Sequence, residues 1–431
     1  MARTRGLFRR LTVVAALLLA SAAIVPHGNA QEPAATAAIT QAESVPPVAA
    51  PVPPAASGNA RNADIPSELA RMENAVLRYR RAVQRGGWPE LPEGKILRPG
   101  MVDPRVLVLR RIVRATGDLR DRTESEEYDP KVVEAVRRFQ YRHGLFPDGR
   151  VGKKTRLAMN VPVEARLAQI ELNLERLRRL PVPEGVYIRV NVPAAMLDVI
   201  EGERRLMRMP VVVGTVVNAT PEFHSQITAM TFNPTWTMPR SVATEEILPL
   251  LQQDPNYLAA NNMTIVDRPD DPHGHTIDWQ SVTPERFPYW FRQAAGPRNP
   301  LGRIRFDIPN TPEIYLHDTP SPGLFDLSVR TFSRGCIRLS RPRELAALLL
   351  RSDPRWDAAA IEAAIATGAT RRVRVPEPMP LLIAYLTAFV EPDGAVHFRE
   401  DIYGRDLPPL EDVVPAVEVP TSANVPSRAG G

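Results

Sequence analysis

The chain has 431 residues and a formal net charge of +5, and 44% of its residues are hydrophobic and 24% charged. This length predicts two or three domains, and this balance is typical of globular proteins. The modest charge, without a clustered stripe of basic and aromatic residues, argues against a nucleic-acid-binding protein. The single cysteine, Cys336, excludes an internal disulfide, so its thiol is reactive, intermolecular or a small buried apolar group.

The first residues have the pattern of an export signal followed by a spacer. Residues 1–30 start with a basic region, continue with the uncharged apolar stretch 11–25 and end in small residues before Gln31. The apolar stretch is short for a membrane-spanning helix, and an uncleaved anchor is the alternative. Residues 31–63 are rich in Ala and Pro, which predicts a disordered linker. No later stretch has the pattern of a transmembrane helix.

Helical periodicity dominates the next part of the chain. Apolar residues recur at helical spacing until Gly86, which ends the first helix. Further helices are predicted at 106–116, directly after an Asp129 cap and, as a short helix, around 155–157. An amphipathic helix at 163–180 is expected to connect this helical part to the β-rich part after it. The expected divisions are an N-terminal helical segment, a small helical module and a connecting helix, at 64–100, 101–165 and 166–185.

From residue 186 the pattern changes to short, β-branched runs separated by turns, at 186–192, 196–200, 209–217, 227–233 and 304–308. This pattern predicts a mainly antiparallel β domain over 186–375, with a helix at 344–350. A helical piece and polar loops interrupt it over about 241–291, which predicts an inserted cap that is mobile and has no core of its own. The fold class is therefore multidomain α+β. The chain should close with a strand segment and a disordered Pro-rich tail, at 376–407 and 408–431.

The segment 315–340 holds the residues that can carry chemistry. A thiol attacks only as the thiolate, so it needs a base or a lowered pKa. His317 is the nearest histidine, 19 residues before Cys336, and neighbouring strand ends could bring the two together. Such a base needs an acceptor at its other ring nitrogen. Gly335 permits a tight turn, and the amides of Gly335 and Cys336 could then face a developing oxyanion.

A second group of polar residues lies in the predicted cap. His273 and His275 stand two residues apart in a polar loop with three nearby aspartates. The loop lacks helical spacing, whereas structural metal sites need a closed ligand set. We therefore expect a solvated loop and neither a metal nor another cofactor. His143, at the end of a predicted helix, is expected at the surface.

The run AVRRFQYRHGLFPDGRVGKKT at 135–155 resembles a peptidoglycan-binding domain of the three-helix type. That family has an AV-x-x-FQ helix followed by GL, DG, G and T at these spacings. The resemblance implies that the small helical module binds the glycan or the stem peptides of peptidoglycan. The alternative is a degenerate module that only packs against its neighbour.

The run 315–340 resembles the active-site motif of the L,D-transpeptidases, the YkuD family. The motif is a His, then Ser-x-Gly-Cys, a hydrophobic residue and Arg or Asn, and it matches His317 and residues 333–338. Arg334 stands where many members have a second His. The similarity covers about 65–406 and is greatest to the large periplasmic branch with an inserted cap. Further matching elements lie at 233–239, 292–302 and 401–406.

The resemblance implies a role for each matching residue. Cys336 is the expected nucleophile, and His317 is the expected general base, oriented by the backbone carbonyl of Asp318. Gly335 is expected to shape the oxyanion site. Arg338 is expected to pair with a substrate carboxylate, with a structural salt bridge as the alternative. The other expected substrate-binding residues are Ser333, Arg334, Trp236, Asn233 and Tyr315, and Trp236 has a core position as its alternative.

The expected reaction is transpeptidation of peptidoglycan stem peptides in the periplasm, through a thioester on Cys336. The acceptor would be the amine of another stem peptide, or of an outer-membrane or wall protein. If water resolves the thioester, the protein is instead an L,D-carboxypeptidase or a cross-link hydrolase, and the same residues allow both. A wall-binding scaffold with an inert thiol would leave His317 and residues 333–338 unexplained. A zinc D,D-peptidase would need ligands that the sequence lacks.

Overall fold

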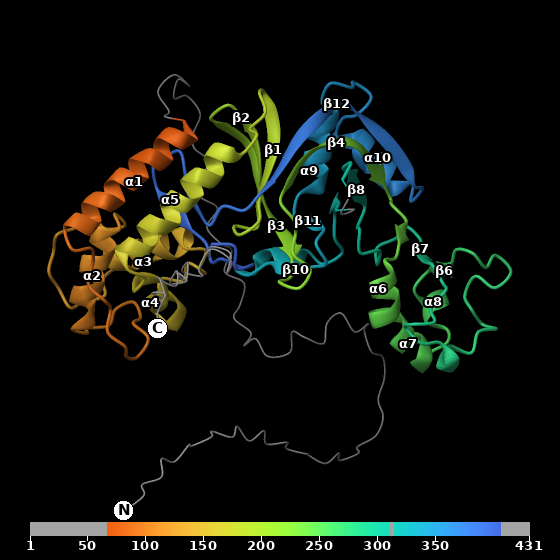
Figure 1. Cartoon of the computed structure of the whole chain (residues 1–431), viewed down its shortest axis with the longest axis horizontal. Coiled ribbons are helices and arrows are strands. Elements are labelled where there is room, and N and C mark those ends of the chain that lie inside the picture. The colour runs from red at the N-terminus through yellow and green to blue at the C-terminus, as the bar shows by residue number, and fades with distance from the viewer. Residues whose placement is uncertain (1–66, 311–313, 407–431) are drawn as a thin grey trace, which may run out of the picture. The chain divides into compact units, whose positions relative to one another are not determined.

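The computed structural model describes residues 67–310 and 314–406 (Figure 1). The described part is a mixed α+β structure, as predicted: the helices α1 to α5 precede a β-rich region that a small cap interrupts. Among these residues, no helix is long and apolar enough to cross a membrane. The predicted export signal, linker and tail lie outside the described residues, at 1–30, 31–63 and 408–431.

The five N-terminal helices begin and end close to the predicted positions. Asp129 caps α3 as expected, because its side chain accepts a hydrogen bond of 3.0 Å from the Val132 amide. Gly117 and Gly144 follow α2 and α3 with positive φ, a conformation that suits glycine and ends a helix. The helices are α1 (Glu68–Gln84), α2 (Arg105–Ala115), α3 (Pro130–Arg142), α4 (Lys153–Met159) and α5 (Val163–Arg179).

Two apolar cores lie in this helical part. Helices α2, α3 and α4 enclose one, which includes Leu109, Phe139 and Met159. Helices α1 and α5 share the other with the C-terminal hairpin of β13 (Ala388–Val390) and β14 (Val396–Phe398). The N-terminal segment, the connecting helix and the last strands, which the sequence predicts as separate segments, therefore form one packed unit.

The end of α3 is buried against this hairpin. Arg142 donates to the Val396 carbonyl at 2.6 Å. His143 lies next to Phe139 and Phe398, with ring centroids 3.8 and 5.3 Å away, and is only 9% exposed. The predicted surface position of His143 is therefore wrong, because a hairpin from the far end of the chain covers it.

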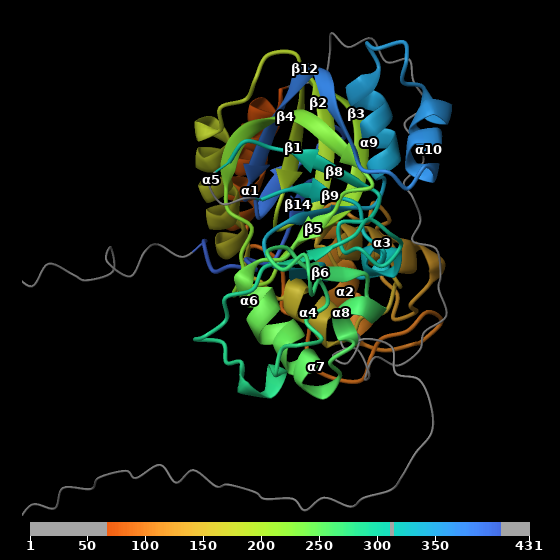
Figure 2. The same ribbon diagram turned by 90° about the vertical axis from the view of Figure 1, so that its right-hand side faces the viewer.

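The β-rich region is a nine-stranded sheet in the order β10-β3-β11-β9-β8-β4-β12-β1-β2, and β2 also pairs with β3. Figure 2 shows the strands with the cap elements below them. Most pairings are antiparallel, as predicted, but β1 with β12, β3 with β10 and β9 with β11 are parallel. The strands are β1 (Val186–Asn191), β2 (Met196–Glu201), β3 (Arg204–Gly214), β4 (Phe223–Phe232), β8 (Ile304–Asp307), β9 (Leu316–His317), β10 (Thr331–Ser333), β11 (Ile337–Leu339) and β12 (Arg371–Ala384).

Strand β12 crosses the predicted border between the β domain and the C-terminal strand segment. It pairs with β1 and β4 and so belongs to the main sheet. The border expected at 375/376 is therefore wrong. Prolines at 376, 378 and 380 are unusual in a strand, so the sequence does not predict one there. The pairing of β12 with β4 accommodates them by a register shift between Arg374 and Met379.

One face of the sheet packs against α9 (Pro342–Leu350) and α10 (Ala358–Ala366) in an extensive apolar core. Helix α9 matches the helix expected at 344–350, whereas α10 has no counterpart among the predicted elements.

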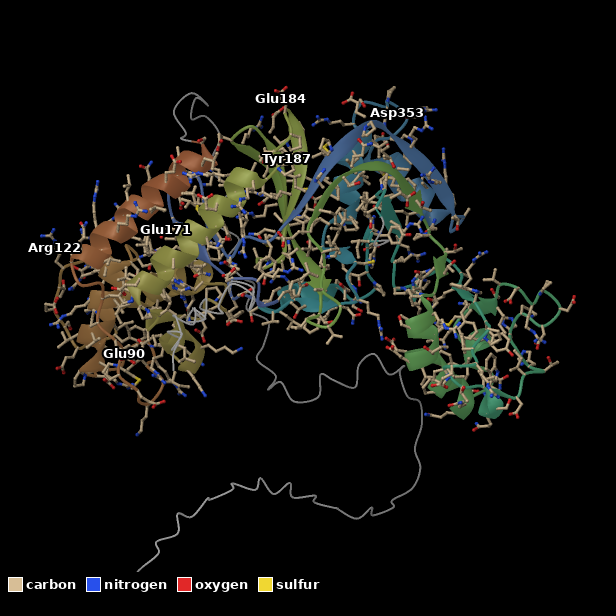
Figure 3. All side chains as sticks on the ribbon, in the orientation of Figure 1. Glu90, Arg122, Glu171, Glu184, Tyr187 and Asp353 are labelled. Atoms are coloured by element: carbon tan, nitrogen blue, oxygen red, sulfur yellow. The ribbon has the colours of Figure 1, made fainter. Side chains whose placement is uncertain are left out.

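At the start of β1 the exposed Glu184 is followed by the buried Tyr187 (Figure 3). The opposite face of the sheet carries the polar residues of the segment 315–340.

The segment predicted as a mobile cap has an apolar core of its own, which includes Leu251, Trp279 and Phe291. The loop before Trp279 is folded onto this core, because the Trp279 indole donates to the Gly274 carbonyl at 3.1 Å. The prediction of an insert without a core is therefore wrong. The core was missed because the apolar residues of the insert follow no regular spacing in the sequence. Its elements are β5 (Trp236–Thr237), α6 (Arg240–Val242), the π-helical turn η2 (Ala243–Ile247), α7 (Leu248–Gln253), α8 (Tyr257–Ala260), β6 (Met263–Ile265), the 3-10 turn η3 (Trp279–Ser281) and β7 (Phe291–Gln293).

Candidate active site

Cys336 lies in the short turn between β10 and β11, residues 333–337, which we call the Cys336 turn. Gly335 has a φ of +107°, which strongly favours glycine, and a Cβ there would lie 3.1 Å from the Ile314 side chain. The Ser333 hydroxyl donates to the Cys336 carbonyl at 2.5 Å and accepts from the Gly335 amide at 3.1 Å. Ser333, expected to bind substrate, therefore braces the turn, and the Gly335 amide is already occupied.

Three basic side chains stand in one row across neighbouring strands. His317 in β9 is paired with Arg338 in β11 and with Arg305 in β8. Cys336 directly precedes β11, and the charges of Arg338 and Arg305 act on its thiol, so it lies close to this row. The apolar Leu316 points to the opposite face, into the core. The pairing of β9 with β11 thus brings Cys336 and His317 to one side of the sheet, as neighbouring strand ends were expected to do.

The imidazole of His317 is held in one tautomer. Its Nδ1 lies 2.6 Å from the backbone carbonyl of Asp318, the contact expected from the sequence. A carbonyl can only accept, so Nδ1 carries the proton and Nε2 keeps its lone pair. Burial, and next the positive charge of Arg338, lower the pKa of His317 to about 4. The ring is therefore a neutral base at pH 7.

The Cys336 thiol is protonated in the resting protein. Burial raises its pKa above the ordinary value, and this effect exceeds the opposing effects of a backbone hydrogen bond from Tyr315 and of the charges on Arg338 and Arg305. A thiol in this state needs a base to remove its proton before it can attack. The site thus combines a nucleophile that needs deprotonation with a neutral histidine.

The guanidinium of Arg338 lies in the same row as His317 and is partly buried. Its Nε is buried and has no hydrogen-bond partner, and burial lowers its pKa. Within the described ranges, 67–310 and 314–406, Arg338 forms no ion pair. The alternative of a structural salt bridge is therefore absent from this part of the chain. A carboxylate that enters the site would match the planar fork of this side chain.

Two residues expected to bind substrate form hydrogen bonds with other parts of the fold. Arg334 points to the cap, where it forms hydrogen-bonded ion pairs with Glu245 at 2.9 Å and Glu246 at 2.7 Å. Asn233 is fully buried, and its amide donates to the Ala364 and Ile365 carbonyls at the end of α10. Each of these side chains therefore joins two elements of the fold.

The remaining expected residues have mixed surroundings. Trp236 is half-buried and packs against the cap core, which agrees with its alternative role as a core residue. The ring of Tyr315 lies under the Arg305 guanidinium, 4.9 Å away, beside the row of basic residues. In the cap, the His273 ring donates to the Met263 carbonyl at 3.0 Å. The part of the chain that the structure describes holds no cluster of three or more His, Cys, Asp or Glu side chains suited to a metal ion.

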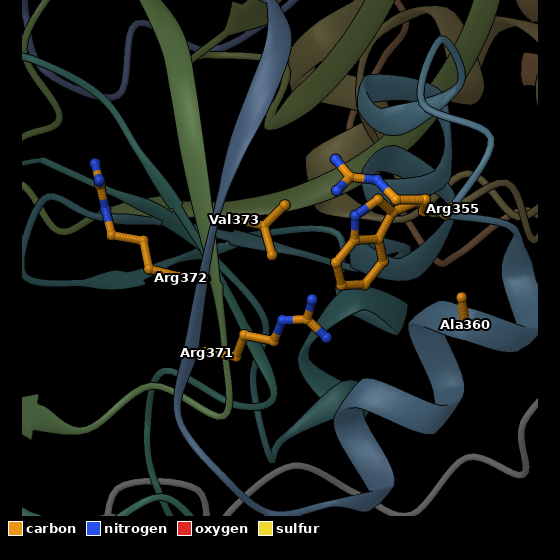
Figure 4. A pocket seen from close by; sticks show the side chains of 6 residues that line it. Arg355, Ala360, Arg371, Arg372 and Val373 are labelled. Atoms are coloured by element: carbon orange, nitrogen blue, oxygen red, sulfur yellow. The ribbon is translucent and has the colours of Figure 1, made fainter.

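A pocket of about 210 Å³ lies elsewhere on the sheet (Figure 4). The Arg371 guanidinium lies over the Trp356 ring in it, 4.8 Å from the ring centre. None of the expected site residues lines this pocket, so it does not mark the chemistry. Its lining residues are Arg355, Trp356, Ala360, Arg371, Arg372 and Val373.

Three residues at this site were not predicted from the sequence. Thr220 donates to the Gly335 carbonyl, and Tyr403 contacts Thr220 in turn. Tyr403 lies in the element at 401–406, whereas no sequence pattern points to Thr220. Arg305 enters the site only through the pairing of β8 with β9, which the sequence does not reveal.

Comparisons with known proteins match two parts of the chain to family models. Residues 185–370 match the YkuD family model, described as "L,D-transpeptidase catalytic domain", and residues 103–159 match the model described as "Putative peptidoglycan binding domain". A protein of Haemophilus influenzae named "Putative L,D-transpeptidase" is 34% identical over 257 residues, which are 58% of this chain and 51% of that protein. The chain thus spans about half the length of this relative.

Solved structures of L,D-transpeptidases are more distant. One from Xylanimonas cellulosilytica is 15% identical, with 68% of this chain and 100% of that chain covered and a TM-score of 0.22. One from Stackebrandtia nassauensis is 12% identical, with 68% and 96% covered and a TM-score of 0.27.

Proposed function

We propose that this chain, whose residues 185–370 belong to the L,D-transpeptidase catalytic domain family, uses Cys336 and His317 to transfer acyl groups between peptidoglycan stem peptides. The observation that carries the proposal is the joint placement of the two residues. Both lie on one face of the sheet, and the Asp318 carbonyl leaves Nε2 of His317 unprotonated. A neutral, oriented histidine on the same side of the sheet as a protonated thiol fits the needs of nucleophilic catalysis.

In the first half of the reaction, Nε2 of His317 takes the proton from Sγ of Cys336. Sγ then forms a bond to the carbonyl carbon of the L-centre at the third residue of a donor stem peptide. The C–N bond to the terminal D-alanine breaks, and the proton on His317 passes to the leaving amine. The product is a thioester on Cys336, and no electrons are exchanged with a cofactor.

In the second half, an amine of another stem peptide attacks the thioester carbon. A new C–N bond forms and the C–S bond breaks, and a proton from the amine passes through His317 to the sulfur, which restores the thiol. Water in place of the amine would give hydrolysis, so the enzyme needs to exclude water while the thioester persists. The cap, tied to the Cys336 turn by Arg334, is placed to do this. An amine of an outer-membrane or wall protein would be chemically equivalent as acceptor.

Arg338 has a separate role in this scheme. Stem peptides carry free carboxylates, and a partly buried guanidinium without an anionic partner favours such a group. We assign Arg338 to the binding of a donor carboxylate next to the reacting carbonyl. Its positive charge also opposes protonation of His317, which keeps the base neutral.

The helical module would bring the enzyme to its polymer. Residues 103–159 match a peptidoglycan-binding model, and the predicted export signal would deliver the protein to the periplasm. Both statements can be tested by sacculus pull-down and by fractionation of cells. Arg142, which joins the module to the hairpin β13–β14, keeps it next to the rest of the fold.

The proposal is tested by product analysis with defined muropeptides. Purified protein is incubated with a tetrapeptide donor and an amine acceptor, and the products are identified by mass spectrometry. We expect a cross-linked product and released D-alanine from the wild type, and neither from Cys336→Ser. Tripeptide without cross-links would assign the protein to the hydrolytic alternative, and no product at all would contradict an enzymatic role.

A further inference from the structure

A residue outside this reaction scheme holds the carbonyl of Gly335. Thr220 is fully buried, and its hydroxyl donates to the Gly335 carbonyl at 2.8 Å. The same hydroxyl accepts from the Gly214 amide at 2.9 Å, at the end of β3. Both hydrogen-bonding functions of this hydroxyl are therefore used, and its position is fixed by the strand next to the Cys336 turn.

The Gly335 carbonyl belongs to the same peptide unit as the Cys336 amide. A peptide unit is planar and trans, so its C=O and N–H point in opposite directions. By holding the carbonyl, Thr220 also fixes the direction of the Cys336 N–H. Among the residues that the structure describes, this N–H donates to no acceptor. The neighbouring Gly335 amide, in contrast, is bound to the Ser333 hydroxyl.

Thr220 is itself held by the C-terminal segment. The Tyr403 hydroxyl accepts from the Thr220 amide at 3.2 Å and donates to the Gly214 carbonyl at 2.7 Å. The Tyr403 amide donates to the Tyr385 hydroxyl at 2.8 Å, which donates to Asp401 at 2.6 Å. A continuous chain of hydrogen bonds thus runs from residues 401–403 to the Cys336 turn.

We propose that Thr220 is a positioning residue that aims the Cys336 amide at the oxyanion formed during acylation. The inference rests on the proposed acylation of Cys336. An unpaired amide in a fixed direction stabilises a developing negative charge, whereas a mobile amide must be reoriented at each turnover. Because the hydroxyl of Thr220 does not touch the thiol, its removal should affect oxyanion stabilisation and leave the nucleophile itself intact.

Two reactions of the same thiol separate these effects. Acylation by a carbapenem passes through a tetrahedral oxyanion, whereas alkylation by iodoacetamide displaces iodide and forms none. The measured quantity is the ratio of the two rate constants, each followed by intact-protein mass spectrometry. We expect Thr220→Val to lower this ratio by about 10- to 100-fold, part of the loss seen when an oxyanion donor is removed. Thr220→Ser, which keeps the hydroxyl, should retain most of the wild-type ratio.

Thr387→Val is the matched control. Thr387 is also fully buried, and its hydroxyl also donates once, to Asp406 at 2.6 Å, and accepts once, from Asn173 at 2.8 Å. This variant also loses one donated and one accepted hydrogen bond, and neither partner lies in the Cys336 turn, so its ratio should equal that of the wild type. A ratio in Thr220→Val equal to the wild-type ratio, or an equal loss in Thr220→Ser, would overturn the proposal.

Tyr403→Phe keeps the test decisive if Thr220→Val does not fold. It removes the hydroxyl that holds Thr220, and we expect the ratio to fall several-fold. An unchanged ratio in folded Tyr403→Phe would contradict the positioning role. A wild type that is alkylated but never acylated would instead contradict the proposed function, so the two failures are distinguishable.

Discussion

His317 is buried in a site where its protonated form is disfavoured, and this has a consequence for the pH dependence of the reaction. Its pKa is lowered from 6.5 to about 4, first by burial and next by Arg338. A histidine with a lowered pKa keeps its base form until the pH falls to that value. We therefore expect acylation kcat/KM to decline at low pH around 4. A decline centred near 6.5 would show that His317 is not the base, or is exposed to water.

The lowered pKa of His317 also predicts how the stability of the fold depends on pH. Between about pH 6.5 and 4 the unfolded chain binds the histidine proton and the folded chain does not, so the free energy of unfolding should fall as the pH falls through this window. His317→Gln removes this contribution. The measurement is urea unfolding at several pH values, and the difference between wild type and variant should shrink toward pH 4. A difference that is constant with pH would contradict the buried neutral state.

Arg338 is expected to contribute through binding of a carboxylate. Arg338→Met removes the charged fork and keeps much of the apolar stem. Hydrogen bonds to charged groups contribute about 1.5–3 kcal/mol, so kcat/KM for a tetrapeptide donor should fall by roughly 10- to 100-fold. Amidation of the donor carboxylates should produce a similar loss in the wild type and little further loss in the variant. Additive losses would show that Arg338 binds no carboxylate.

The site was only partly predictable from single residues. The motif identifies Cys336, His317 and the Asp318 carbonyl as site residues. It can do so because the short strands and the turn that hold these residues lie within the motif itself. Ser333 and Asn233 donate to backbone carbonyls, because short polar side chains can bond to the backbone as readily as to a ligand. No sequence pattern points to Thr220. The role of a single buried hydroxyl becomes visible only when the folded chain shows which two segments it connects, here the end of β3 and the Cys336 turn.

At the scale of elements, the cap is tied to the Cys336 turn by one charged cluster. Arg334 pairs with Glu245 and Glu246 in the π-helical turn η2, a kind of irregularity found frequently at functional sites. If this contact keeps water from the thioester, Arg334→Glu should raise hydrolysis relative to transfer by a few-fold, since a surface ion pair contributes little energy. Product analysis with an amine acceptor measures this ratio.

The control for the cap prediction is an ion pair of similar exposure elsewhere. Arg343 in α9 pairs with Glu362 in α10 at 2.7 Å, and Arg343→Glu should leave the product ratio unchanged. Reversal of all three charges, with arginine at positions 245 and 246 added to Arg334→Glu, should restore transfer. Equal product ratios in wild type and Arg334→Glu would show that the cap does not protect the thioester at this contact.

Elements whose apolar residues recur at a regular spacing were predicted well, and elements without such a spacing were not. The five N-terminal helices and the strands β1 to β4 have apolar residues at helical or strand spacing. Strand β12 carries three prolines, and the cap core is assembled from side chains with no repeat. A period identifies which face of an element is buried, but it cannot reveal a core that many irregular segments build together.

At the scale of the whole molecule, the helical module is joined to the rest by buried contacts. Arg142 pairs with the buried Asp118 and donates to the Val396 carbonyl in β14. Removal of one partner from a buried pair costs about 3–5 kcal/mol, because it leaves the other charge unpaired. Arg142→Met should therefore lower the free energy of unfolding by about this amount in urea titrations.

Arg137→Met is the control for this change, since Arg137 lies in the same helix and its ion pair with Glu134 is exposed. It should change the free energy of unfolding by less than about 0.5 kcal/mol. If Arg142→Met is equally mild, the module is independent of the hairpin. We expect instead that deletion of residues 101–165 destabilises the whole fold, because it exposes the core that α1 and α5 share with β13 and β14.

The most direct test of the central claim is to trap the acyl-enzyme. Full-length protein is mixed with a tetrapeptide muropeptide without acceptor, quenched in acid and mapped by peptide mass spectrometry. The account predicts a mass increase equal to the donor minus D-alanine, located on Cys336, and its loss when an amine acceptor is added before the quench. An adduct on another residue, or cross-linking by Cys336→Ser at the wild-type rate, would contradict it.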